Sequence, residues 1–159
     1  MKKIILIYLV VLLFSGMIKL NAQCTLPYKP ISMFNNDTES FINYNFSDRA
    51  DCYKDKTLVE VMADLKLPIK SFICIDSDEN GTTFDGISIF LAPLDYITYQ
   101  KLFNGKFFSK IVIKWKTSRN LSEIEPLLRT TKVNWDNWTP EVENLLKNIP
   151  IGEVGILKR

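Results

Sequence analysis

The chain has 159 residues, of which 47% are apolar and 24% are charged. This is enough length for one domain, and the composition is that of a globular protein and not of a disordered one. There is no histidine, which excludes Ser-His-Asp and Cys-His catalytic sites and removes the commonest zinc ligand. Cys-x-x-Cys pairs and glycine-rich phosphate-binding motifs are also missing from the sequence, so zinc and nucleotide sites have no support.

Residues 1–22 have the shape of a secretory signal peptide. Lys2 and Lys3 precede an apolar run, Ile4 to Ile18, that is shorter than the ~20 residues of a membrane-spanning helix. We expect cleavage after Ala22 and a periplasmic or extracellular location; an uncleaved N-terminal anchor is the alternative, and the only membrane contact expected. Without the three lysines of this segment, 17 basic residues face 18 acidic ones, so the net charge is −1 and not +2. A near-neutral domain has no electrostatic footprint for nucleic acid.

Three cysteines remain after the signal segment: Cys24, Cys52 and Cys74. Cysteines of exported proteins tend to pair. We favour a disulfide between Cys24 and Cys52, because Cys74 lies within an apolar run and reads as a buried residue. A bond between Cys52 and Cys74 is the alternative, and the third cysteine could bridge to a partner protein.

The elements follow a lead-in over residues 23–40 that we expect to be irregular. Phe41 to Phe46 alternates apolar and polar residues, which predicts a half-buried strand. Thr57 and Glu60 have capping-box spacing at the start of a helix, and Pro68 ends that helix. Further strands are predicted at 69–76, 87–91, 107–116 and 150–157, and further helices at 93–104, 122–129 and 139–147.

The order of elements from residue 41 to residue 116 is therefore β-α-β-β-α-β, with a C-terminal α-α-β extension. We predict an α+β domain over residues 41–159, with a mainly antiparallel sheet and helices on one face. This order is that of the ferredoxin-like split βαβ unit, although other α+β sandwiches share it. Lysines alternate with apolar residues in the strand 107–116, which indicates that one sheet face meets water.

The acidic turn after residue 75 resembles the first half of a calcium-binding loop. Asp76, Asp78 and Asn80 occupy positions 1, 3 and 5, and Asp85 is at position 10. Position 12 should be a bidentate glutamate, but Ile87 stands there. The competing interpretation is a solvated turn between two strands, in which Asp and Asn are favoured for turn formation. We favour the turn, and keep calcium as the one cofactor worth testing.

Two tryptophans, Trp135 and Trp138, flank a short polar segment. They could form a stacking platform for a sugar or an anchor for a partner protein. They could also attach a loop to the core, and we favour this second interpretation.

These observations favour an exported, non-enzymatic domain that binds an unknown protein partner, such as an inhibitor, an immunity-type protein or an envelope accessory. The alternative is a small-ligand or calcium-binding domain that uses the acidic loop 76–85 or the two tryptophans. The i, i+2 carboxylate pairs do not face each other on a helix and give little support to an enzyme. Richness in Lys, Asn and Ile suggests a bacterial origin.

Overall fold

A computed structural model describes residues 24–76, 82–91, 110–130 and 137–157 of the chain. Its sheet is antiparallel throughout, and each strand pairs with the next one in sequence. The strands are β1 (Ser71–Asp76), β2 (Thr83–Phe90), β3 (Lys110–Asn120) and β4 (Ile151–Leu157). The predicted α+β class and antiparallel sheet are therefore confirmed.

Helices precede β1 and separate β3 from β4. Within the described ranges the α-helices are α2 (Thr38–Asn43), α3 (Leu58–Leu65), α5 (Glu125–Thr130) and α6 (Pro140–Leu146). Shorter 3-10 or π turns are η1 (Ile31–Phe34), η2 (Tyr44–Asp48), η3 (Ala50–Tyr53) and η4 (Leu121–Glu123).

Local sequence fixes the starts of two helices. The Glu60 carboxylate accepts a 2.8 Å hydrogen bond from the backbone N–H of Thr57, so the predicted capping box of α3 is confirmed. In α6 the Thr139 hydroxyl accepts from the Val142 N–H at 3.3 Å, and Pro140 occupies the first turn as predicted.

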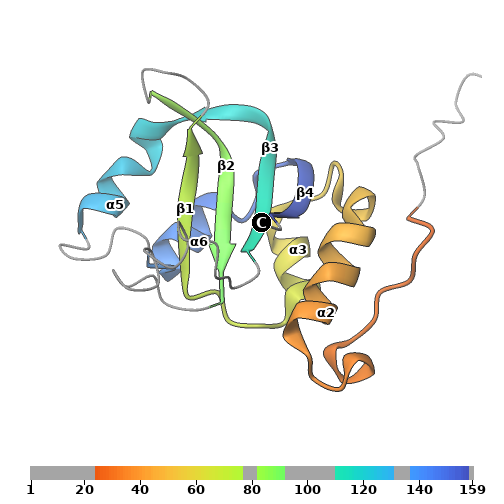
Figure 1. The fold of residues 1–159 in the computed structure, drawn as a ribbon. Coiled ribbons are helices and arrows are strands. Elements are labelled where there is room, and N and C mark those ends of the chain that lie inside the picture. The colour runs from red at the N-terminus through yellow and green to blue at the C-terminus, as the bar shows by residue number, and fades with distance from the viewer. Residues whose placement is uncertain (1–23, 77–81, 92–109, 131–136, 158–159) are drawn as a thin grey trace, which may run out of the picture.

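The core lies between one face of the sheet and the helices. Register places Ile87 opposite Ile113 and Ile89 opposite Ile111, and all four side chains are buried. Figure 1 shows α6 behind the sheet and α2 on the outer side of α3. The helices contribute buried apolar residues to the same cluster: Phe41 and Ile42 from α2, Leu58, Val61 and Leu65 from α3, and Val142 and Leu146 from α6.

The opposite face of the sheet is buried at β2 and exposed at β3. Ser88 and Phe90 of β2 are buried, whereas Lys114 and Lys116 of β3 are exposed. Lys114 forms a cross-strand ion pair of 3.5 Å with Glu153 of β4. The prediction that lysines of this strand meet water while its isoleucines meet the core is confirmed for these residues.

The predicted strand from Phe41 to Phe46 is wrong, because this segment is helical in α2 and η2. Asp37 caps the helix by accepting from the Glu39 N–H at 3.0 Å. A strand over these residues would place Asn45 among its polar, outward positions, but its side chain is fully buried. It can be buried because its amide group donates to the carbonyls of Lys29 and Phe41, which satisfies the polar atoms.

The β-α-β-β-α-β order is consequently wrong in its first strand, and the meander of β1 to β4 is not the strand order of a split βαβ unit. The predicted helix over 93–104 lies outside the described residues. The lead-in also differs from the prediction, since residues 23–40 include η1 and the start of α2.

Strand β3 bends where its register with β2 shifts. Phe84 pairs with Arg119 but Gly86 pairs with Lys114, so β3 has extra residues opposite Asp85. The bend directs β3 toward α5 across the end of the sheet (Figure 1). Gly86 permits a close approach here: a Cβ atom at this position would lie 2.0 Å from the backbone oxygen of Ile113.

Candidate functional site

The N-terminal segment, residues 24–34, is attached to the helical layer by a disulfide. Cys24 bonds to Cys52 of η3, and their Cα atoms are 4.6 Å apart. This is the pairing that the sequence favoured. Cys24 is exposed and Cys52 is buried. Cys74 lies half-buried in β1 and takes no part in the disulfide.

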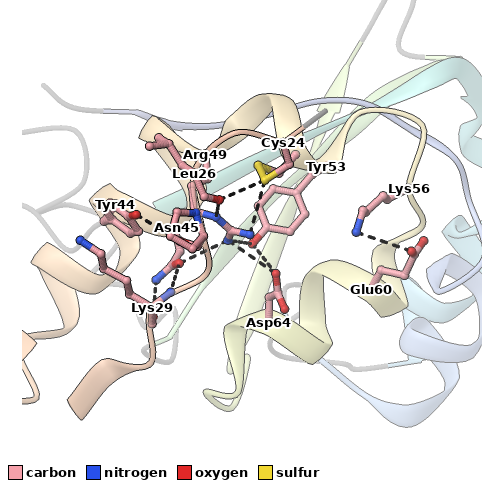
Figure 2. The surroundings of a disulfide bond; sticks show 12 residues. Cys24, Leu26, Lys29, Tyr44, Asn45, Arg49, Tyr53, Lys56, Glu60 and Asp64 are labelled. Atoms are coloured by element: carbon pink, nitrogen blue, oxygen red, sulfur yellow. Dashed lines mark hydrogen bonds and ion pairs between the residues drawn. A yellow bond between two sulfur atoms is a disulfide. The ribbon is translucent and has the colours of Figure 1, made fainter. Parts of the chain in front are cut away.

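Arg49 is the second attachment of this segment. Its side chain is only 7% exposed. Nε donates to the carbonyl oxygen of Leu26 at 2.9 Å, and one terminal nitrogen contacts the Cys24 sulfur at 3.8 Å. The other terminal nitrogen donates to the Tyr53 hydroxyl at 3.2 Å and to the Asn45 side-chain oxygen at 3.3 Å. Figure 2 shows these groups gathered around the guanidinium.

The charge of Arg49 is balanced by Asp64 of α3. The carboxylate lies 3.6 Å from the guanidinium and is about one-third exposed (32%). The Tyr53 hydroxyl donates to the same carboxylate at 2.9 Å. Burial, together with the neighbouring carboxylate, raises the pKa of Tyr53 well above its ordinary value, so the phenol stays neutral. With these partners the buried guanidinium connects the N-terminal segment to η3 and α3.

Sequence reasoning missed this cluster, because it predicts no helix or strand between the segment 41–46 and the helix that begins at Thr57. One signal was present. Asn45, Arg49 and Tyr53 are spaced four residues apart, a spacing that would place their side chains on one side of a regular helix. The strand prediction for residues 41–46 concealed that spacing.

Two aromatic rings of the segment, Tyr28 and Phe34, pack against rings of α2 and η2. Phe34 packs against Phe41 and Tyr44, with ring centroids 6.1 and 5.7 Å apart. Tyr28 packs edge-on against Phe41 at 6.4 Å. The Lys29 ammonium sits 4.2 Å from the centroid of the Tyr44 ring. These rings are half-buried except Phe41, so their outer edges remain accessible.

Apolar side chains also point outward from the segment. The exposed large hydrophobic residues of the described chain are Leu26 (38%), Met33 (64%) and Val59 (45%), and the first two belong to residues 24–34. Met33 adjoins Phe34 in η1, and the Tyr44 hydroxyl donates to the carbonyl of Pro27, next to Leu26, at 3.1 Å. We define the N-terminal surface by five side chains: Leu26, Lys29, Met33, Phe34 and Tyr44.

Two of the four predicted calcium residues, Asp76 and Asp85, fall within the described part of the chain. Asp76 ends β1, and Asp78 and Asn80 lie outside the described residues. Asp85 accepts a short hydrogen bond from the Ser118 hydroxyl on β3. Among residues 24–76, 82–91, 110–130 and 137–157, no group of three or more His, Cys, Asp or Glu side chains could hold a metal ion. Calcium binding by loop 76–85 stays a prediction.

Of the two predicted tryptophans, Trp135 lies outside the described residues and Trp138 is half-buried. The Trp138 ring packs edge-on against Phe72 of β1, 5.7 Å between centroids. Its indole N–H donates to the Glu143 carboxylate at 3.4 Å, and its backbone N–H donates to the carbonyl of Lys70. These contacts are those of a side chain that fixes the start of α6 to the sheet. A ligand platform made by both tryptophans stays a prediction.

Helices in the described ranges are all too short or too polar to cross a membrane. The chain matches no protein-family model, no curated protein and no solved structure.

Proposed function

We propose that this protein is an exported, non-enzymatic domain that binds another protein through the N-terminal surface. The observation that carries the proposal is the position of Leu26 and Met33. Both are exposed apolar side chains on one short segment. Met33 adjoins the half-buried Phe34, and Leu26 precedes Pro27, whose carbonyl accepts from the hydroxyl of the half-buried Tyr44. Aromatic residues and methionine are enriched where proteins contact each other, and aromatic anchors supply much of the binding energy.

The restraints on the N-terminal segment also support a binding function. A disulfide, the Arg49–Leu26 hydrogen bond and the Asn45–Lys29 hydrogen bonds restrain an otherwise extended stretch of chain. Binding by a restrained segment costs less conformational entropy than binding by a flexible one. These restraints involve backbone atoms of Leu26 and Lys29, so the two side chains remain available to a partner.

The chemistry of the surface indicates the kind of partner. Leu26, Met33 and Phe34 offer apolar contact area, and Met33 can adapt its shape to different surfaces. Lys29 provides one positive charge over the Tyr44 ring. A matching partner surface would therefore have apolar side chains around a carboxylate. Export is consistent with a disulfide and with the predicted signal segment.

Affinity capture from the native source tests the proposal with three proteins. The double variant Leu26→Asp, Met33→Asp places charges on the N-terminal surface without touching the backbone bond to Arg49. Val59→Asp makes the same kind of change at an exposed hydrophobic residue of α3 and is the matched control. We expect a partner recovered by the wild type and by Val59→Asp but lost by the double variant. Equal recovery by all three would exclude this surface.

A further inference from the structure

The two sulfur atoms of the disulfide lie in different surroundings. Cys24 is solvent-exposed and its sulfur contacts a guanidinium nitrogen at 3.8 Å. Cys52 is 8% exposed and belongs to the apolar core. A neighbouring guanidinium favours a thiolate, whereas apolar burial favours a protonated thiol. The two cysteines would therefore behave differently once the bond between them is broken.

We propose that the Cys24–Cys52 disulfide is a site of reversible exchange with an external dithiol, in which Arg49 holds Cys24 as the leaving thiolate. This proposal does not depend on the proposed binding function. It assigns a chemical step to a bond that would otherwise be only a structural restraint.

The exchange takes two displacements. A thiolate of the external dithiol attacks the exposed Cys24 sulfur; a new sulfur–sulfur bond forms, the Cys24–Cys52 bond breaks, and the electron pair leaves with Cys52, which takes up a proton. The second thiol of the reagent loses its proton to solvent and attacks the reagent sulfur that is bonded to Cys24. This step expels Cys24 as a thiolate. The protein gains two electrons, and the reagent is oxidised to a disulfide.

The Arg49 guanidinium should stabilise the reduced form of the disulfide. Arg49 is buried, and its nearest described counter-ion, Asp64, is 3.6 Å away and partly exposed. A thiolate on Cys24 would give this cation a second anionic partner, on the terminal nitrogen that contacts the sulfur. Contacts between two charged groups are about twice as strong as those between neutral ones. Stabilising the reduced form makes a disulfide easier to reduce.

Other groups near Cys24 oppose its ionisation or leave it unchanged. The carbonyl oxygen of Leu26 is 3.1 Å from the sulfur and would favour a protonated thiol. The negative charge of Asp64, 3.6 Å from the guanidinium, also opposes ionisation. Tyr53 is neutral, and the Lys66 ammonium lies over the Tyr28 ring, 5.4 Å from its centroid. The guanidinium outweighs the carbonyl because it carries a full charge in a buried position.

The test is the pH dependence of the reduction equilibrium, measured in glutathione buffers by counting alkylated thiols by mass. Each unit by which a cation lowers the pKa of a thiol makes reduction up to about tenfold more favourable at pH 8, but has little effect at pH 6, where the thiol stays largely protonated. We therefore expect Arg49→Gln to be roughly tenfold harder to reduce than wild type at pH 8 and nearly equal at pH 6. Lys66→Gln removes a cation of the same layer and should follow the wild type at both pH values.

A lost fold would not imitate this result, since it would make the disulfide easier to reduce at every pH. A second measurement avoids the Arg49 variant altogether. The alkylation rate of Cys24 in the reduced wild type is followed against pH, in buffer and in concentrated urea. A midpoint lower in buffer than in urea supports the proposal. Identical midpoints, or an Arg49→Gln profile identical to wild type, would overturn it.

Discussion

Removing the disulfide should lower the stability of the domain by an amount that follows from the loop it closes. Cys24 and Cys52 are 28 residues apart in sequence. In the chain-entropy treatment, a crosslink over such a loop contributes about 3.6 kcal/mol by restricting the unfolded state. The variant Cys24→Ser, Cys52→Ala removes the crosslink, placing a polar atom at the exposed position and an apolar side chain at the buried one.

Urea unfolding followed by tryptophan fluorescence measures the effect. For a slope of roughly 2 kcal/mol per molar urea, the loss corresponds to a midpoint lower by about 2 M. The reduced wild type at pH 6, where Arg49 is expected to have little effect on the reduced form, is the control and should unfold near the same midpoint, because it lacks the same crosslink. The Leu26–Arg49 and Lys29–Asn45 hydrogen bonds survive in both proteins, so the native signal at zero urea should remain. A loss below about 1 kcal/mol would refute the entropic reasoning.

Three further predictions concern the sheet, a helix cap and the acidic loop. Gly86→Ala should destabilise the protein by about 1–3 kcal/mol or more, since its Cβ would collide with β3, while Gly155→Ala, whose Cβ meets nothing within 4 Å, should be neutral or stabilising by about 0.5–1 kcal/mol in thermal unfolding. The hydrogen bond from the backbone N–H of Thr57 lowers the pKa of Glu60, so the carboxylate stabilises α3 at pH values above its unfolded pKa, and this contribution is lost as pH falls through the folded pKa. Glu60→Gln should therefore reduce the loss of unfolding free energy at acidic pH, by no more than about 0.5 kcal/mol because the side chain is half-exposed. An unchanged dependence of stability on acidic pH would contradict the cap. Millimolar calcium should leave the melting temperature unchanged if loop 76–85 is only a turn, and a rise that Asp85→Asn abolishes would establish the site.

Elements with strong local signals were predictable from the sequence. The start of α3 follows from the Thr57–Glu60 spacing, and that of α6 from Thr139-Pro140. Alternating lysines identified the exposed face of β3 because burial on one side of a strand repeats every second residue. The disulfide was predictable because Cys74 lies in an apolar strand. In each case the decisive contacts are within a few residues or follow a simple period.

The N-terminal layer was not predictable in the same way. Residues 41–46 alternate like a strand, but Asn45 is buried by hydrogen bonds to the backbone of Lys29, sixteen residues earlier in the chain. Arg49 is buried for a similar reason, since its partners come from the N-terminal segment and from α3. Such partners are set by tertiary contacts, and a local pattern does not contain them. The candidate surface depends on this layer and was therefore missed.

Site-specific photo-crosslinking in the native cell tests the central claim most directly. A photoreactive side chain replaces Met33 of the N-terminal surface in one protein and Val59 of α3 in another, two exposed positions on different elements. Binding through the N-terminal surface predicts a discrete crosslinked protein from position 33, lost when Leu26 is changed to Asp in the same chain, and none from position 59. The same crosslinked proteins from both positions, or none from position 33, would contradict the claim.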